Sequence, residues 1–195
     1  MYFNSGKGSL NPQDIRKAAN FIVPNALTAG TLSTGAVAAD RYYWYPLIVG
    51  NNDLVLTHIG VALSVAASAG KKGRAAIYSD CGNRVFEPYD LLYDCGEFAI
   101  DVTGFTGVNI HSTFGEYITL QRNTLYWVAF ALEEAVTAYY KATATLLSIC
   151  VAGSAISTPK TAWRASRAYA TGFPSNATSV AALTDDAGYM LVGVL

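Results

Sequence analysis

Charged side chains are scarce in this sequence. Only 14% of its 195 residues are Asp, Glu, Lys or Arg, against about 25% in an ordinary globular chain. The formal net charge is −1 at pH 7, so the chain lacks the basic surface with which nucleic-acid-binding proteins neutralise phosphates. Because 52% of the residues are hydrophobic, we expect part of the surface to contact copies of the chain or another protein, and no nucleic acid as a partner.

Residues that commonly hold metals or cofactors are also few. The two histidines, His58 and His111, form no HxH or HExxH motif, and no cysteine has the spacing of a metal site. We therefore predict no metal and no cofactor. The odd number of cysteines (Cys81, Cys95 and Cys150) favours free thiols in a reducing compartment. A Cys81–Cys95 bridge is the alternative.

Long apolar runs and export signals are missing. The most apolar stretch, residues 142–156, is shorter than the roughly 20 residues of a membrane-spanning helix and contains serines and threonines. The first 14 residues have no basic start followed by an apolar segment, as a secretory signal would. We expect no membrane insertion.

Catalytic motifs are missing as well. Residues 70–73 place two lysines between glycines but lack the GxxxxGK[ST] frame of a phosphate-binding loop, and no GxSxG occurs. The carboxylate pairs Asp94/Glu97 and Glu133/Glu134 are the remaining candidates, since glycosidases use two carboxylates roughly 5–10 Å apart. Adjacent acids at strand ends are usually solvated, so we predict that the protein is not an enzyme.

Alternation with a period of two is the main structural signal. In residues 54–65, β-branched and aliphatic residues alternate with others, as in a strand with one face in a core. The aromatic run 41–48 is expected to form the preceding strand, joined to it by a tight turn at residues 51–53. Pro46 cannot donate a hydrogen bond to a ladder, so a sheet edge or bulge is expected near it.

Further runs predict short strands between Gly, Asn and Pro turns. Residues 124–132 are apolar on both faces and are expected to form a central strand that is covered on both sides. A helix over residues 132–142 competes with the strand interpretation there. Other strand candidates are residues 28–39, 74–79, 91–102, 108–111, 116–120, 139–151 and 189–195. The pattern predicts an all-β fold, a jelly-roll-like antiparallel β-sandwich with a short N-terminal arm.

Two segments depart from this pattern. Residues 1–29 are predicted to be an arm ahead of a sandwich domain over residues 30–195, with a helix of two turns over residues 15–21 after the Asn11-Pro12 entry. The arm is either a disordered tail or a segment that docks on a larger assembly. Residues 154–187 form a loop-rich excursion before the terminal strand, and such long segments are usually functional or packed against a neighbour.

Aromatic residues are the main candidates for an interface or a ligand site. Aromatic side chains bury large areas and dominate contact energies, and they can stack on sugars. Those in the irregular segment, with the two arginines beside them, are preferred. The candidate residues are Trp163, Arg164, Arg167, Tyr169, Phe173, Trp44 and Tyr42.

The order of several core and turn motifs resembles a known family. The motifs are RYYWYP (41–46), LTHIGVAL (56–63), GRAAIY (73–78), LLYDCG (91–96), LYWVA (125–129) and TGFP (171–174). They resemble the β-sandwich domain of tailed-bacteriophage virion proteins, such as tail fibres, head fibres and other capsid-surface appendages. The resemblance covers residues 30–195 and carries no catalytic signature.

This resemblance implies a non-enzymatic structural protein of the virion, made in the host cytoplasm. It implies a homo-oligomer, commonly a trimer, that docks on capsid or tail proteins through residues 1–29. Fibre proteins usually have long N-terminal shafts, so the short arm favours a capsid decoration or head-fibre protein over a long tail fibre. The alternative function is a carbohydrate-binding module for host adhesion, with a host surface glycan as the ligand.

Overall fold

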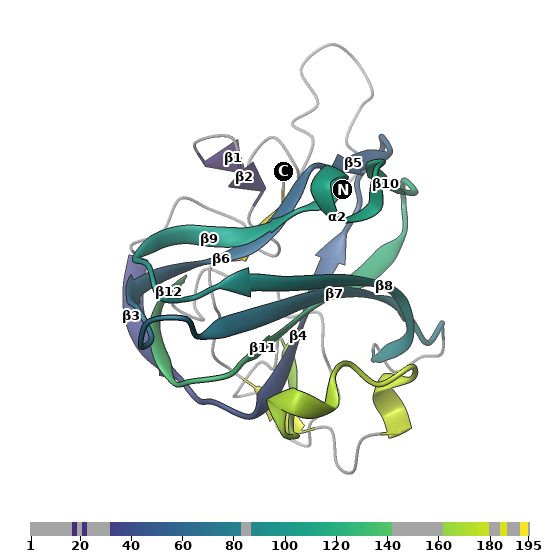
Figure 1. Ribbon diagram of the computed structural model, residues 1–195. Helices are drawn as coiled ribbons and strands as arrows, with labels where there is room; N and C mark the ends of the chain where they lie inside the picture. Colours follow the sequence, from purple (N-terminus) through teal and green to yellow (C-terminus); the bar gives the residue numbers. More distant parts are fainter. Residues whose placement is uncertain are drawn as a thin grey trace.

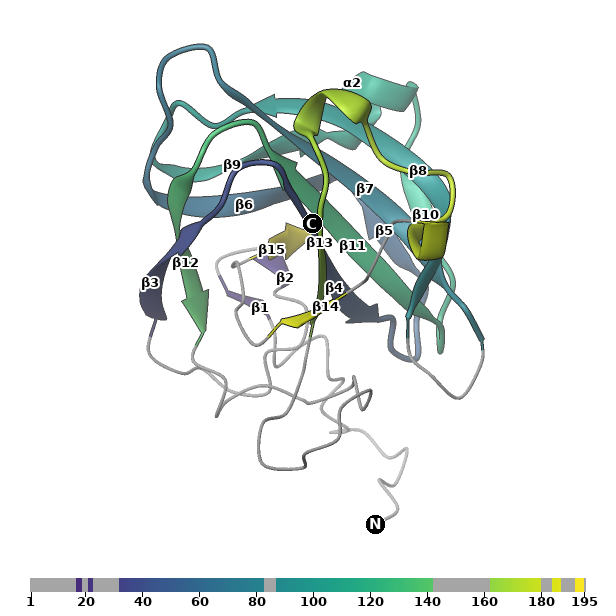
Figure 2. The same cartoon turned by 90° about the horizontal axis from the view of Figure 1, so that it is seen from below.

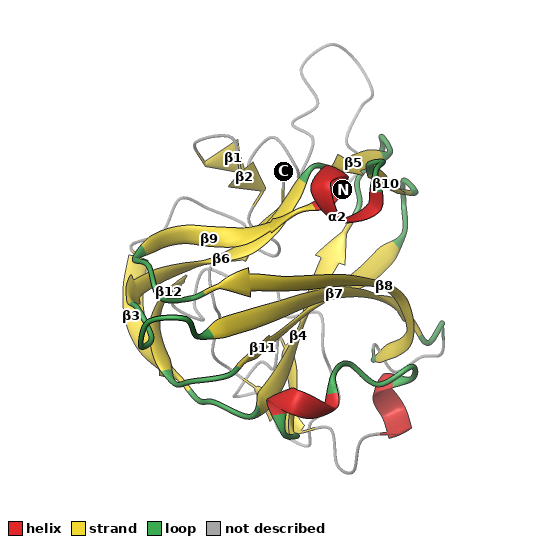
Figure 3. Ribbon diagram, viewed as in Figure 1, coloured by secondary structure: helices red, strands yellow, loops and turns green. Residues whose placement is uncertain are grey.

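The computed structural model describes residues 17–18, 21–22, 32–82, 87–141, 162–179, 184–186 and 192–194. These residues form antiparallel strands in packed sheets, so the all-β sandwich predicted from the sequence is confirmed. Figure 1 shows the two main sheets as layers, and Figure 3 shows how little of the described chain is helical.

The six-stranded sheet contains the long central strands. Its strands are, in spatial order, β14 (Thr184–Asp186), β13 (Ala162–Ser166), β4 (Arg41–Ile48), β11 (Leu125–Leu132), β7 (Lys72–Asp80) and β8 (Pro88–Ala99).

The seven-stranded sheet lies against it and is organised around β6. The path runs through β1 (Lys17–Ala18), β2 (Phe21–Ile22), β15 (Val192–Val194), β6 (His58–Val65), β12 (Val136–Lys141) and β3 (Leu32–Val37), and β9 (Gly104–Asn109) also pairs with β6. A separate pair, β5 (Leu54–Leu56) and β10 (Ile118–Leu120), lies at one end of the sandwich.

Strand β11 is buried on both faces, which confirms the central strand predicted at this position. Tyr126, Val128 and Phe130 belong to the core between the two sheets. Trp127 and Ala129 belong to a second core on the outer side of the six-stranded sheet. Because successive side chains point to opposite faces of a strand, an apolar residue at every position requires cover on both sides.

The predicted hairpin over residues 41–65 is wrong. Strand β4 lies in the six-stranded sheet and β6 in the seven-stranded sheet, so the turn at residues 51–53 crosses between layers. The turn is held against a second turn, since the backbone N–H of Arg122 donates to the Asp53 carboxylate over 2.9 Å. The sequence pattern identified the strands but carried no information about their partners.

The continuous strand predicted over residues 54–65 is also interrupted. Thr57 separates β5 from β6, and the buried positions change phase there. Leu56 is buried before the break and Ile59 after it, while Val55 is exposed. A shift of one residue moves a strand's apolar set to the other face, and the single alternating pattern concealed this shift.

Pro46, predicted to lie near a sheet edge or bulge, stands in β4 between two paired strands. Among the described residues, β13 pairs with β4 as far as Trp44, two residues before Pro46. On the other edge, Pro46 pairs with Trp127 of β11. On the β13 side, the positions that would face Pro46 lie outside the described residues, so the predicted edge stays a prediction there.

One local prediction was wrong, one alternative is not found, and one strand begins earlier than predicted. The described residues 17–18 and 21–22 form the small hairpin β1–β2, in place of the helix predicted over residues 15–21. The competing helix over residues 132–142 is absent in the described residues 132–141, where a turn joins β11 to β12. The strand predicted over residues 139–151 begins earlier, at Val136, and residues 142–151 lie outside the described part of the chain.

A short helix, α2 (Ile110–Phe114), replaces the end of the strand predicted over residues 108–111. The side chain of Asn109 accepts a hydrogen bond from the backbone N–H of Ser112 over 3.0 Å, which is an N-cap. Gly115 ends the helix with a φ of 76°, a left-handed conformation that favours glycine. A helix of this length has no apolar period of its own from which it could be predicted.

Two glycines let β6 and β9 approach closely. Gly60 and Gly107 are directly paired. A Cβ atom at Gly60 would overlap the carbonyl oxygen of Thr106 and lie 2.7 Å from the Cα of Gly107. The backbone is the obstacle, so no side-chain rotation relieves it.

We expect Gly60→Ala to lower the free energy of unfolding by about 1–3 kcal/mol, the usual cost of overpacking. Val65→Ala, in the same strand but 57% exposed, should change it by less than about 0.5 kcal/mol. Urea denaturation followed by circular dichroism measures both. Equal stabilities of the two variants would contradict the close approach.

Candidate functional site

Residues 167–179, named the strap here, cross the outer face of the six-stranded sheet. The strap follows β13, and β14 pairs with β13, so the excursion starts and ends beside the same strand. It contains two short 3-10 turns, η2 (Tyr169–Thr171) and η3 (Ala177–Ser179). Figure 2 shows this yellow-green segment lying along the sheet.

The strap covers the rings of Tyr42, Trp44 and Tyr78, which are called the aromatic floor here. Phe173 contacts the rings of Tyr42 and Tyr78 edge-on, with centroid distances of 5.1 and 6.2 Å. Tyr42 also stacks on Trp44 at 6.2 Å. The buried residues of this second core are Tyr42, Trp44, Ala76, Tyr78, Trp127, Ala129, Ala131, Trp163, Ala165, Tyr169, Phe173 and Ala177.

Hydroxyl groups of the floor hold the strap backbone. The Tyr78 hydroxyl donates to the carbonyl of Pro174 over 2.7 Å, and the Tyr42 hydroxyl donates to that of Gly172 over 3.0 Å. Burial raises the pKa of Tyr78, so this phenol remains a donor at any physiological pH. The floor thus combines apolar contact with fixed hydrogen bonds.

Carboxylates of the sheet side hold the two ends of the strap. The backbone N–H of Tyr169 donates to Asp40 over 2.8 Å. At the other end, the Asn176 amide donates to Asp90 over 3.0 Å, and the Leu91 N–H donates to the Ser175 carbonyl over 2.9 Å. The excursion predicted to be functional or packed on a neighbour is, over these residues, packed on its own chain.

Glu97 joins the strap to β7. The Arg74 guanidinium donates to Glu97 Oε1 over 2.9 and 3.1 Å, and the Tyr169 hydroxyl donates to the same oxygen over 3.2 Å. Arg74 also lies 5.1 Å from the centre of the Tyr169 ring. Lys72 binds the other oxygen, Oε2, over 3.0 Å. Hydrogen bonds from Lys72 and then Arg74 hold the pKa of Glu97 below its usual value.

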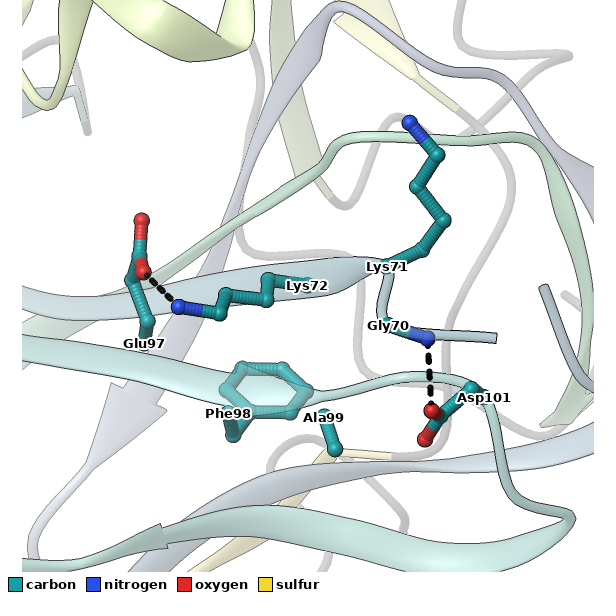
Figure 4. Close-up of a pocket in the computed structure, with 7 residues that line it drawn as sticks. All are labelled: Gly70, Lys71, Lys72, Glu97, Phe98, Ala99 and Asp101. Carbon is teal, nitrogen blue, oxygen red and sulfur yellow. Dashed lines mark hydrogen bonds and ion pairs between the residues drawn. The ribbon is translucent and has the colours of Figure 1, made fainter. Parts of the chain in front are cut away.

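A shallow pocket of about 230 Å³ lies beside Glu97, at the β7–β8 end of the sandwich (Figure 4). Phe98 and Ala99 line its apolar part. Its polar groups are paired with each other, since Lys72 binds Glu97 and the Gly70 N–H donates to Asp101 over 2.8 Å. The two lysines of residues 70–73 thus sit in ion pairs, Lys71 with Glu133 over 2.9 Å and Lys72 with Glu97.

The acidic pairs from the sequence have structural partners. Glu97 is bound by Lys72 and Arg74, whereas the Asp94 carboxylate accepts a hydrogen bond from the N–H of Gly96 over 3.1 Å. Glu133 binds Lys71, and Glu134 accepts from the Ser68 hydroxyl over 2.8 Å. These contacts give each carboxylate a role in holding turns and strands together.

The structure brings most of the sequence candidates together, but as a core. Tyr42, Trp44, Trp163, Tyr169 and Phe173 are all buried in the second core. Their rings are therefore covered within the chain.

The two arginine candidates are not members of this core, although Arg167 contacts one of its rings. Arg167 donates from Nε to the Gly172 carbonyl over 3.2 Å and lies 6.0 Å from the centre of the Tyr42 ring. Arg164 is half-buried in β13, paired with Tyr43 and Thr184. Arg164 thus belongs to the strand from which the strap starts, and Arg167 belongs to the strap itself.

Exposed aromatic residues gather elsewhere, around α2, where sequence reasoning did not place a site. Tyr117 is 51% exposed and Phe114 is 39% exposed. Tyr117 contacts His111 at 5.1 Å between ring centroids, and Phe114 contacts Tyr93 at 6.2 Å. The signal available in the sequence was the presence of Phe114 and Tyr117 in a segment that lacks the alternation of a strand.

The cysteine prediction is confirmed where the structure describes it. Cys81 and Cys95 are free thiols, and Cys150 lies outside the described residues. Burial raises the pKa of the Cys95 thiol to about 12, so this thiol is protonated and unreactive at neutral pH. The alternative Cys81–Cys95 bridge is not formed.

Within the described residues, no group of three or more His, Cys, Asp and Glu side chains is arranged to hold a metal ion. No helix in that part of the chain is long and apolar enough to span a membrane. Comparisons with protein-family models and with curated proteins find no match.

We expect Glu97→Gln to destabilise the protein at neutral pH and to have little effect in acid. The pKa of Glu97 is lowered in the folded state, so its stabilisation is present above the unfolded pKa and is lost as pH falls through the folded pKa. The pair is partly exposed, so the loss at pH 7 should be at most about 1 kcal/mol, or about 2–4 °C in Tm. Thermal melts of both proteins between pH 7 and pH 3 measure this difference.

Glu116→Gln is the matched control, because Glu116 is an exposed acid outside the strap network. A Tm difference between wild type and Glu97→Gln that stays constant down to pH 3 would show that the ion pairs do not produce it.

Proposed function

We propose that this chain is a non-enzymatic structural protein of a tailed-bacteriophage virion. It is a surface appendage of the capsid-decoration, head-fibre or tail-fibre type. The sandwich self-assembles into a homo-oligomer, a trimer, and residues 1–29 dock it on capsid or tail proteins.

The observation that carries this proposal is where the motifs of the resemblance lie. LTHIGVAL spans β5 and β6, GRAAIY lies in β7, LLYDCG in β8 and LYWVA in β11. TGFP holds the strap residues that contact the aromatic floor. The shared motifs are thus those that build the sandwich and its cover, which supports a common architecture with virion appendages.

The layout of charge agrees with a structural role. The described ionic groups near the pocket are bound to one another and join turns to strands. The described part of the arm is also tied into the sheet, since Ile22 of β2 pairs with Val194 of β15. Because its described strands pair with the sheet, the arm can transmit attachment at residues 1–16 to the whole domain.

Deleting residues 1–16 tests the docking role, because this deletion keeps both β1 and β2. We expect the truncated chain to keep the solution mass of the full-length protein but to be absent from purified virions, as detected by immunoblotting. Truncated chain on virions at full-length amounts would show that the arm does not dock the protein. Absence of the full-length chain from virions would contradict the virion assignment itself.

A second candidate function, glycan binding for host adhesion, is favoured by the exposed aromatic residues around α2. Two ring contacts, Tyr117 with His111 and Phe114 with Tyr93, orient these side chains. Rings held in this way lose little conformational freedom when a sugar stacks on them.

If this function is correct, Tyr117→Ala and Phe114→Ala should each weaken binding to host surface polysaccharide about tenfold, the effect of a typical contact hot spot. Val102→Ala, an exposed apolar position away from α2, should leave binding unchanged. Glycan-array binding followed by calorimetry measures these affinities. A wild-type chain that binds no host glycan would eliminate this candidate and leave the structural role intact.

A further inference from the structure

A chain of side-chain hydrogen bonds joins His58, at the start of β6, to the N-cap of α2. The side-chain nitrogen Nδ2 of Asn109 lies 3.2 Å from Nε2 of the His58 ring, and Asn109 Oδ1 accepts from the backbone N–H of Ser112 over 3.0 Å. His58 and Asn109 are directly paired across β6 and β9, so their side chains project on the same side of the sheet. His58, Asn109 and Ser112 are called the cap relay here.

The Ser112 N–H fixes the direction of every hydrogen bond in the cap relay. A backbone N–H can only donate, so the Asn109 side-chain oxygen faces Ser112 and the Asn109 NH2 group faces His58. An amide NH2 group can only donate as well, so Nε2 of His58 must be the unprotonated nitrogen that accepts. The proton of the neutral ring is therefore on Nδ1, which donates to the Thr57 hydroxyl oxygen over 3.2 Å.

Helix α2 depends on these contacts because it has only five residues. The first N–H groups of a helix have no partner within it, and a helix of this length is not stable alone. The Ile110 N–H donates to the Thr57 carbonyl over 2.9 Å, and the Ser112 N–H donates to Asn109. Thr57 and Asn109 also bond to the His58 ring. Figure 1 shows α2 at the end of β9 and beside β5.

A proton on Nε2 of His58 is incompatible with the cap relay. The protonated nitrogen and the Asn109 NH2 group would face each other as two donors. Rotation of the Asn109 amide would offer its oxygen to the ring, but it would turn the NH2 group toward the Ser112 N–H and remove the cap. Either the ring or the start of the helix thus loses its partner. Because histidine side chains ordinarily change charge between about pH 5 and 8, mild acid is enough to create this conflict.

We propose that His58 is a pH-sensitive switch for α2, which keeps the helix capped when the ring is neutral and uncaps it when the ring is protonated. The capped helix binds one proton fewer than the uncapped one, so acid favours the uncapped state. Helix α2 carries the exposed ring of Phe114, and the exposed ring of Tyr117 packs against His111 of the same helix. Mild acid therefore releases both rings from their fixed positions. The switch goes beyond the proposed function and operates whether or not these rings bind a glycan.

His111 is the competing source of a pH response near α2, because it is the other histidine of the chain. It lies on α2 and contacts the ring of Tyr117, outside the cap relay. Strands β9 and β15, which pair with β6, contain no Asp, Glu, Lys, Arg or His in their described residues. Strand β12 packs on β6 and β8 packs on α2, and their charged residues are Lys141, Asp90, Asp94 and Glu97. An experiment between pH 5 and 8 must therefore separate His58 from His111.

Nuclear magnetic resonance of the isotope-labelled full-length chain, between about pH 7.5 and pH 5.5, tests the switch. Nitrogen shifts of the imidazole rings report which ring nitrogen carries the proton, and Cα shifts of residues 110–114 report how much of α2 is helical. At the upper pH we expect the proton of His58 on Nδ1. As Nε2 gains a proton, the ratio of helical to uncapped α2 should fall about fivefold, the equivalent of about 1 kcal/mol for a lost N-cap.

Three variants separate the switch from other effects of acid, and circular dichroism confirms that each is folded. His58→Gln keeps an acceptor that does not titrate, so α2 should stay helical throughout the pH range. His111→Gln removes the other histidine and should keep the wild-type response. Asn109→Asp should reverse the response, because a carboxylate can accept from the Ser112 N–H and from a protonated His58 ring at the same time, so that acid strengthens the cap.

Two results would overturn the switch. One is a wild-type chain whose α2 shifts stay constant while the His58 ring titrates, or whose response survives in His58→Gln and disappears in His111→Gln. The other is a His58 ring with its proton on Nε2 at the upper pH, which would contradict the cap relay itself. The ring measurement uses the wild-type chain alone, so it decides the matter even if a variant does not fold.

Discussion

The need to cover both faces of β11 and its neighbours governs this structure. Strands β4, β7 and β11 are apolar on both sides, so a single sheet packed against them would leave Trp44, Tyr78 and Trp127 in water. Burying apolar surface contributes about 25 cal/mol per Å², and these side chains are large. The seven-stranded sheet covers one side and the strap covers the other. The strap is therefore part of the fold, although it lacks the alternation of a strand.

The same constraint explains which parts of the fold could be predicted. The apolar run that became β11 identified a central, doubly covered strand, because its composition reflects both of its environments. The sequence could not show that β4 and β6 lie in different sheets, because a turn of Asn and Asp fits a hairpin and a crossover between sheets equally well. The phase change at Thr57 was hidden because Val55 and Ile59 are both β-branched, although one is exposed and the other buried.

The site residues show a similar division. Aromatic composition located Tyr42, Trp44 and Phe173 as important, and they are, but as one packed layer. Whether an aromatic ring faces a partner or its own chain depends on contacts between distant segments, such as Tyr78 with Pro174. The exposed rings of Phe114 and Tyr117 depend on α2, a helix set by one Asn cap and one glycine. A cap residue and a terminal glycine do not change the spacing of hydrophobic residues, so hydrophobic periodicity does not predict such a helix.

The second core gives the molecule an optical property. All three tryptophans of the chain, Trp44, Trp127 and Trp163, lie in that core beneath the strap, and none lies between the two sheets. Intrinsic tryptophan emission therefore reports on one layer of the molecule, while backbone circular dichroism reports on the strands of both sheets. If the strap detaches before the sheets separate, the two signals change at different denaturant concentrations. If cover and sandwich unfold as one unit, the signals coincide, as two-state behaviour requires.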